Sequence, residues 1–491
     1  MGHVLKPPPP DQSRRLQQFF AEAGYTEEGF VAALRTVEPP LPHLRSLPRL
    51  LDLTREPTVF NTLARWFLAG LPVDAGRARE STPDWFRRTC LESGLLFSDG
   101  EALVPTSLLV PSGKFLVAAD LYQRLLSATD FDHVLTINPA ARLLLDFTIR
   151  RPSWSTLDLC AGCGIQALAA AAHSQVVVAT DLNPRATAFA AFNARLNGCE
   201  NLDFLTGDGF APVEGRAFDL IVCNPPFILA PTKRYLYRDN DMDLDGFCRA
   251  LVRQAPRHLN EGGYFQMIFE WAQVQGQAWQ ERVAEWFEGT GCDVWLLKNY
   301  TQEPGWYAQI RLRETPFRSQ EADAAGYDEW MTYYRGRRVE AMHGGLVAMR
   351  RRSGPNWLRI EELPESLHPP FGQSILRGFE ARDFLEAHPS DEGLLACRLK
   401  VAGEVRLDQE YRWSEGHWRT VAIRLRLAEG LPRAMGLDGD VAQFLARFDG
   451  TRTVREVIRT LASEVAVDPA RVQAESLAVV RHMVERGILL L

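Results

Sequence analysis

The spacing of apolar positions changes several times along this chain. Between residues 12 and about 70, apolar side chains recur at helical spacing. Over residues 86–117, a helix is followed by apolar runs on either side of Asp99 and Gly100, a pair typical of a tight hairpin turn. We therefore predict a mostly helical N-terminal domain over residues 1–130 that includes a winged-helix-like module.

From Thr156 onward, apolar strands alternate with helical segments, which is the pattern of a doubly wound parallel sheet. The predicted strands are 156–160, 176–181, 202–206, 218–223, 264–270, 293–298 and 306–313, and the predicted helices are 165–172, 185–197, 243–259 and 277–288. Because no helix-length segment separates the last two strands, we expect them to pair as a hairpin that makes one edge of the sheet antiparallel. This α/β domain is predicted to span residues 131–318.

The remainder of the chain follows a third pattern. Short strands with Pro and Gly punctuation continue to about residue 427, and helical segments follow to the end. Basic clusters at 335–338 and 350–352 are more typical of a solvated surface than of a binding site. We predict an α+β region over residues 319–429 and a small winged-helix-like module over residues 430–491.

The length and composition of the chain exclude several classes of protein. A chain of 491 residues has room for about three domains. Its 55 Lys and Arg against 62 Asp and Glu give a net charge of −7, so no protein-wide positive field attracts nucleic acid. The eight cysteines lack paired extracellular spacing, and no apolar run approaches the roughly 20 residues that span a bilayer. We expect a cytoplasmic protein with reduced thiols and no membrane partner.

A glycine-rich turn follows the first strand of the α/β domain. Asp158 ends the strand, and Gly162 and Gly164 allow a ligand to approach the backbone in the turn that opens the next helix. Such turns bind nucleotides, NAD or S-adenosylmethionine. A dinucleotide-binding fold would continue with a second mononucleotide-binding half, but an antiparallel edge is expected here, which favours S-adenosylmethionine. Cys160 and Cys163 lack a second Cys or His pair nearby, so we expect no metal or redox site.

Two further aspartates follow the next two strands. Asp181 is placed where a carboxylate accepts hydrogen bonds from both hydroxyls of an adenosine ribose, although it could instead begin the helix that starts at Asn183 and Pro184. Asp208 falls where this architecture contacts the adenine amino group, or it is an ordinary turn residue. Both positions are consistent with a nucleoside cofactor.

The most specific signal is Asn224-Pro225-Pro226-Phe227, directly after the fourth strand. Two prolines end regular hydrogen bonding, so a rigid turn projects from the edge of the sheet where ligands bind. A planar amine can donate one hydrogen to the Asn224 side-chain oxygen and another to the Pro225 carbonyl, while Phe227 stacks on its plane. These contacts would aim the nitrogen lone pair at a methyl donor without a metal or a covalent nucleophile.

Together these motifs resemble the NPPF class of S-adenosylmethionine-dependent class I N-methyltransferases, which includes adenine N6, guanine N2 and release-factor glutamine methyltransferases. The resemblance implies a Rossmann-like, seven-stranded core with S-adenosylmethionine as cofactor. It implies catalytic roles for Asn224, Pro225, Pro226 and Phe227, and cofactor contacts from Asp158, Cys160, Ala161, Gly162, Gly164, Asp181, Leu182, Asn183, Asp208, Gly209 and Asn224.

Further segments of the chain carry other resemblances. Residues 138–152, 235–239 and 340–352 are similar to a poorly characterised bacterial set of methyltransferases with N- and C-terminal extensions. The closing segment from Phe444 onward is similar to small winged-helix modules that include the peptide-binding PqqD-like domains. The first similarity concerns architecture and gives no substrate.

The expected function is N-methylation of an exocyclic amine of RNA or DNA, either adenine N6 or guanine N2. The basic and aromatic residues of 233–238 suit a nucleotide or an anionic peptide, or they form a structural lid over the cofactor. The alternative is methylation of a protein or peptide glutamine amide, with the C-terminal module holding the polypeptide. A third possibility, a catalytically silent binding protein, is disfavoured by the intact glycine turn and Asn224.

Overall fold

The computed structural model describes residues 5–35, 47–126, 131–314, 320–363, 369–428, 430–431 and 434–491. The chain forms two compact units, one of residues 1–145 with 151–361 and the other of residues 146–150 with 362–491. The predicted domain boundaries at residues 130, 318 and 429 lie outside the described residues.

The N-terminal part of the first unit is mainly helical. Its elements are α1 (Pro10–Glu22), α2 (Glu27–Leu34), α3 (Leu47–Leu53), α4 (Val59–Leu63), the π-helix η2 (Ala64–Leu68), β1 (Val73–Asp74), α5 (Ala75–Ser81), α6 (Asp84–Glu92), β2 (Leu96–Ser98), β3 (Ala102–Pro105), β4 (Ser107–Ser112), β5 (Phe115–Asp120) and the 3-10 helix η3 (Tyr122–Leu126). The Asp99 carboxylate accepts hydrogen bonds from the backbone N–H groups of Glu101 and Ala102, which closes the predicted turn between β2 and β3. The strand order β1-β3-β2 around α5 and α6 is compatible with the winged-helix-like prediction.

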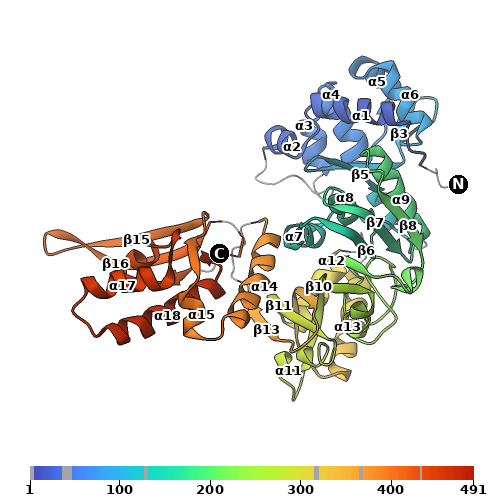
Figure 1. Cartoon of the computed structure of the whole chain (residues 1–491). Coiled ribbons are helices and arrows are strands. Elements are labelled where there is room, and N and C mark those ends of the chain that lie inside the picture. The colour runs from blue at the N-terminus through green and yellow to red at the C-terminus, as the bar shows by residue number, and fades with distance from the viewer. Residues whose placement is uncertain are drawn as a thin grey trace. The chain divides into compact units, whose positions relative to one another are not determined.

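An eight-stranded sheet forms the centre of the first unit (Figure 1). Its strands are β6 (Ser153–Leu159), β7 (Ser174–Asp181), β8 (Leu202–Thr206), β9 (Phe218–Cys223), β10 (Leu259–Val274), β11 (Cys292–Gln302), β12 (Val339–Arg351) and β13 (Leu358–Glu362), in the spatial order β13-β11-β12-β10-β9-β6-β7-β8. The strands from β8 to β10 are parallel, and β12 is antiparallel to both β10 and β11. This arrangement confirms the expected Rossmann-like α/β core, and the sheet has one strand more than the seven that were expected.

One predicted strand is wrong. Residues 306–313 belong to helix α12 (Pro304–Arg313), whose N-cap Glu303 accepts hydrogen bonds from the backbone N–H groups of Gly305 and Trp306. The antiparallel strand is instead β12, inserted between β10 and β11 after a further helix, α13 (Gln320–Gly336). The sheet therefore continues beyond the end predicted for this domain.

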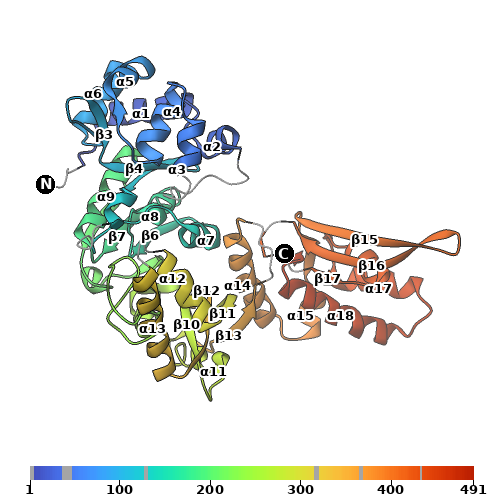
Figure 2. The ribbon, with the colours of Figure 1, turned by 180° about the vertical axis from the view of Figure 1, so that it is seen from behind.

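Helices cover the sheet on both faces. They are α7 (Pro139–Phe147), α8 (Ile165–Ala170), α9 (Pro184–Leu196), η4 (Ala211–Val213), α10 (Gly246–Gln254), η5 (Ala255–His258) and α11 (Trp279–Ala284), in addition to α12 and α13. The hairpin of β4 and β5 lies beside α9 in both views (Figures 1 and 2). The buried side chain of Asn193 on α9 joins them through hydrogen bonds to the backbone of Ala118, which ties the N-terminal elements to the helix next to the glycine turn.

The second unit has a core of its own. Its elements are α14 (Gly372–Ala387), α15 (Asp391–Leu395), β14 (Arg398–Val401), β15 (Val405–Ser414), β16 (His417–Leu427), β17 (Met435–Gly436), α16 (Gly439–Leu445), β18 (Asp449–Thr453), α17 (Val454–Glu464), α18 (Pro469–Glu485) and β19 (Leu489–Leu490). The strands β15 and β16 form a long hairpin that extends past the helices of this unit (Figure 1). Within the described ranges, no helix has the length and apolar character needed to cross a membrane.

Candidate cofactor and substrate site

A cavity of about 710 Å³ opens at the carboxyl ends of the parallel strands. Open α/β sheets bind ligands at this edge, and the volume is within the range of small-molecule sites. The wall contains most of the residues predicted for the site: Cys160, Ala161, Gly162, Asp181, Leu182, Asn183, Asp208, Gly209, Asn224, Pro225, Pro226 and Phe227. Residues from four different strand ends thus meet around one space.

Asp181 organises the turn on the cofactor side of this cavity. One carboxylate oxygen accepts a hydrogen bond from the backbone N–H of Gly162 at 2.8 Å, and the other accepts one from Asn183 at 2.8 Å. Burial raises the pKa of Asp181, and these two backbone hydrogen bonds oppose the shift. Each oxygen keeps a further lone pair for a ligand hydroxyl. The N-cap of α9 is Asn183, whose side chain accepts from the N–H of Arg185.

Asp158 and Gly164 are not among the residues that line the cavity. Asp158 is 1% exposed beneath the turn, and its carboxylate accepts a hydrogen bond from the backbone N–H of Ala167 at 2.8 Å. Burial raises the pKa of Asp158 to about 7. Gly164 has φ +82°, and a Cβ there would stand 2.7 Å from the Cβ of Ala190 on α9. Both residues shape the turn without lining the cavity, and their direct contact with a cofactor stays a prediction.

The wall of the cavity fits a nucleoside cofactor. Gly162 has φ +54°, and no atom lies within 4 Å of where its Cβ would be, so the backbone is open to a ligand. The hydroxyls of Thr136 and Thr180 are buried without a hydrogen-bond partner among the described residues, and both residues line the cavity. Asp208 is exposed at the rim. Polar atoms without partners, an open backbone and the Asp181 carboxylate together match the chemistry of an adenosine with a ribose diol.

The Asn224–Phe227 turn forms the opposite part of the wall. The Pro226 carbonyl accepts a hydrogen bond from the side-chain amide of Asn240 at 3.0 Å, which fixes the turn to the segment that follows it. Within the part of the chain that the structure describes, the side chain of Asn224 has no hydrogen-bond partner. Its amide therefore stays available to a ligand in the cavity.

The segment of residues 233–239 is held by hydrogen bonds and ion pairs of its own. The buried Asp239 carboxylate accepts hydrogen bonds from the backbone N–H groups of Arg234 and Tyr235 and pairs with the Arg238 guanidinium at 2.8 Å. Lys233 pairs with Asp241 at 2.6 Å. Because two of its cations are neutralised by neighbouring carboxylates, the structure favours the lid interpretation of this segment over a phosphate-binding one.

Sequence reasoning missed two groups of lining residues. The segment from His133 to Ala141 lines the cofactor side of the cavity, and Glu270, Tyr300 and Arg311 line the cavity beyond the Asn224–Phe227 turn. No periodic pattern indicates either group, since the first spans a loop and the start of α7, and the second comes from β10, β11 and α12. Cys160 and Cys163 are free thiols, and within the described ranges no group of three or more His, Cys, Asp or Glu side chains is arranged to hold a metal ion.

Comparison with known proteins identifies the central domain. The family model of the methyltransferase small domain matches residues 133–287. The central domain is a class I methyltransferase domain of this family. The match confirms the resemblance drawn from the sequence motifs, and the cofactor of a methyltransferase domain of this kind is S-adenosylmethionine. A second model, described as a domain of unknown function, matches residues 377–491.

Curated relatives match a part of this chain. A release factor glutamine methyltransferase of Cereibacter sphaeroides is 36% identical over 155 residues, which are 28% of this chain and 54% of the relative. A ribosomal RNA small subunit methyltransferase C of Salmonella arizonae is 32% identical over 134 residues, 27% of this chain and 36% of the relative. The chain thus spans about half or less of these relatives' lengths.

A solved structure with a similar domain is the ribosomal protein L11 methylase of Lactobacillus delbrueckii subsp. bulgaricus. The likeness covers 44% of this chain and 81% of that one at 21% identity, with a TM-score of 0.26. A likeness at this level supports no inference about substrate.

Proposed function

We propose that this protein is an S-adenosylmethionine-dependent N-methyltransferase that acts on a planar primary amine. The observation that carries the proposal is the Asn224–Phe227 turn, with the side-chain amide of Asn224 free of partners among the described residues, in the same cavity as Gly162 and Asp181. S-adenosylmethionine, when bound, supplies an electrophilic methyl group on its sulfonium.

The chain's own residues provide binding and orientation. Asp181 accepts from the ribose hydroxyls, and the open backbone at Gly162 admits the cofactor. The side-chain oxygen of Asn224 and the carbonyl of Pro225 accept the two hydrogens of the target amine, and Phe227 packs against its plane. With both hydrogens held, the nitrogen lone pair points at the methyl group, so the rate enhancement comes from orientation and fixed dipoles.

For the substrate class, we propose an exocyclic base amine of RNA or DNA. Aromatic residues line the cavity beside the turn, including Phe227, Tyr237 and Phe247, and a nucleobase can stack on such faces. The order of elements from β1 to β3 matches a winged-helix module, which could hold nucleic acid. The relative named as a ribosomal RNA methyltransferase agrees with this choice.

A glutamine amide of a protein is the second candidate. The exposed carboxylate of Asp208 lines the cavity, where it opposes a phosphate backbone more than a neutral amide. The relative named as a release factor glutamine methyltransferase acts, by that name, on such an amide.

Transfer of tritium from methyl-labelled S-adenosylmethionine distinguishes the candidates. The acceptors are unmodified ribosomal RNA, genomic DNA and a release factor that lacks glutamine methylation, each incubated with the wild type and with the Asn224→Ala variant as the control. We expect label in nucleic acid with the wild type and a loss of about a hundredfold in the variant. Label confined to the release factor would replace the first candidate with the second, and label independent of Asn224 would refute the proposed chemistry.

A further inference from the structure

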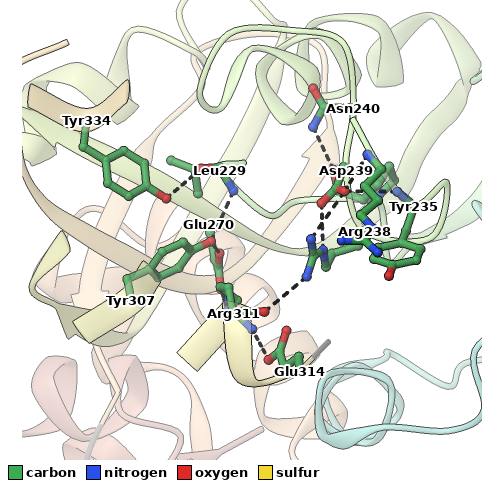
Figure 3. A network of polar contacts seen from close by, with 12 residues as sticks. Leu229, Tyr235, Arg238, Asp239, Asn240, Glu270, Tyr307, Arg311, Glu314 and Tyr334 are labelled. Atoms are coloured by element: carbon green, nitrogen blue, oxygen red, sulfur yellow. Dashed lines mark hydrogen bonds and ion pairs between the residues drawn. The ribbon is translucent and has the colours of Figure 1, made fainter. Parts of the chain in front are cut away.

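A buried carboxylate, that of Glu270, lies in the second half of β10, the strand next to β9, which leads into the Asn224–Phe227 turn. Figure 3 shows Glu270 with Tyr307 and Arg311 beside it. Glu270 is 1% exposed, and it accepts hydrogen bonds from the hydroxyls of Tyr300 and Tyr307 and from the guanidinium of Arg311. Burial raises the pKa of Glu270, and Arg311 opposes that shift. With three donors around it, the carboxylate acts as an acceptor only.

A glycine in the neighbouring strand β12 makes room for this cluster. Gly344 on β12 pairs with Glu270 of β10 on one side and with Tyr300 of β11 on the other. A Cβ at Gly344 would lie 2.2 Å from the ring of Tyr300. Because glycine leaves this face of β12 empty, the Tyr300 ring crosses the strand and reaches the carboxylate. A glycine at position 344, in the 340–352 segment, is thus needed for the Tyr300 ring to reach Glu270.

The same cluster reaches the main chain just after the catalytic turn. The backbone N–H of Leu229 donates to the Tyr307 hydroxyl at 3.2 Å, and the Leu229 carbonyl accepts from the Tyr334 hydroxyl at 2.8 Å (Figure 3). Leu229 lies two residues beyond Phe227, and it is fully buried. On its other side the loop is held by Asn240, which donates to the Pro226 carbonyl.

The protonated Tyr307 hydroxyl donates to one of its two partners and accepts from the other. Burial raises the pKa of Tyr307, so its phenol stays protonated at neutral pH. Its single proton is donated to Glu270, which leaves an oxygen lone pair to accept from the N–H of Leu229. The Glu270 carboxyl oxygen therefore orients the Tyr307 hydroxyl, and that hydroxyl in turn holds Leu229.

We propose that Glu270, Tyr307 and Tyr334 are positioning residues that fix Leu229 and thereby hold the Asn224–Phe227 turn in the geometry that receives the target amine. The inference rests on the proposed N-methyltransferase function. It assigns a role in turnover to residues that do not contact the cofactor-binding turn. Two further members of the cluster, Tyr300 and Arg311, contact Glu270 without touching Leu229.

This difference provides a matched pair of variants. Tyr307→Phe and Tyr300→Phe each remove one hydroxyl that donates to Glu270, but only Tyr307→Phe deprives the Leu229 N–H of its acceptor. Hydrogen-deuterium exchange of the peptide that contains Leu229 is measured in the full chain with S-adenosylhomocysteine bound, so this arm needs no acceptor substrate. Affinity for S-adenosylmethionine, melting temperature and kcat on the acceptor that the wild type labels are measured in parallel.

We expect Tyr307→Phe to speed exchange at Leu229 and to lower kcat at least about tenfold, with cofactor affinity within twofold of the wild type. Tyr300→Phe should leave that exchange unchanged, because Tyr300 does not touch Leu229. Equal effects of the two variants on the exchange at Leu229, or a parallel loss of cofactor affinity in Tyr307→Phe, would overturn the inference.

Should Tyr307→Phe fold poorly, Tyr334→Phe tests the same point, because its hydroxyl holds Leu229 without contacting Glu270. We expect lower kcat with unchanged cofactor affinity here as well, and wild-type kcat would overturn the inference. Full turnover by Asn224→Ala would refute the proposed function instead, and it would leave the exchange result at Leu229 as it stands.

Discussion

The Asp181→Ala variant tests the cofactor side of the site. In the structure the Asp181 carboxylate holds the backbone N–H groups of Gly162 and Asn183, each at 2.8 Å, and it faces the cavity. The substitution therefore removes two acceptors for the ribose hydroxyls and also releases the two backbone groups that shape the turn.

The size of the effect follows from these contacts. A hydrogen bond to a charged group contributes about 1.5–3 kcal/mol, and about 1.4 kcal/mol corresponds to a tenfold change in affinity. Loss of one such bond already lowers affinity about tenfold, and loss of both lowers it a hundredfold or more. Because water can replace part of the lost contact, we expect a decrease of at least about tenfold.

Isothermal titration calorimetry with S-adenosylmethionine measures this effect directly. Asp203→Ala is the matched control, since Asp203 is an exposed aspartate on β8 and is absent from the cavity wall. Asp181→Asn should bind more weakly than the wild type, because its amide N–H would face a backbone N–H. An Asp181→Ala affinity within twofold of the wild type, with normal binding by Asp203→Ala, would refute the assignment of Asp181 to the ribose.

Three further outcomes are expected. Gly164→Ala should destabilise the fold by about 2–5 kcal/mol in urea unfolding, because the new Cβ meets Ala190 and because φ is positive; a midpoint equal to that of the wild type would contradict this packing. Asp158, whose pKa rises to about 7 in the fold from about 3.9 in the unfolded chain, stabilises the fold below about pH 4, and this contribution is lost as pH rises through 7. Between pH 5 and pH 8, the melting temperature of Asp158→Asn should therefore fall less than that of the wild type. Equal decreases would contradict the raised pKa of Asp158. A chain that ends at residue 318 lacks β12, the strand between β10 and β11, and should show no cooperative melting, whereas a chain that ends at residue 361 should melt cooperatively and bind cofactor.

The parallel half of the fold was predictable from sequence because each strand and helix there is short, local and periodic. The predicted strands at 176–181 and 202–206 agree closely with β7 and β8. The antiparallel part was not predictable in the same way. Residues Trp306, Ala308, Ile310 and Leu312 alternate as in a strand, but Pro304 after the N-cap Glu303 begins a helix, and this local signal decides the structure.

The missed strand has a different cause. β12 pairs with β10 across a separation of more than sixty residues, for instance Glu270 with Gly344, and periodicity carries no information about such pairing. For the same reason, the cluster of Glu270, Tyr300, Tyr307, Arg311 and Tyr334 could not be anticipated, since its members lie on β10, β11, α12 and α13. The residues of the cofactor turn and of the Asn224–Phe227 turn were predictable because each motif is contiguous and has a defined place at a strand end.

The most direct test of the account is the position of the transferred methyl group. The acceptor that the wild type labels is methylated with ¹³C-methyl S-adenosylmethionine, digested to nucleosides or peptides, and analysed by tandem mass spectrometry and NMR. The account predicts the label on a nitrogen that carried two hydrogens, with product formation reduced about a hundredfold in Asn224→Ala while cofactor affinity is retained. A methyl group on oxygen or carbon, or full turnover by Asn224→Ala, would contradict it.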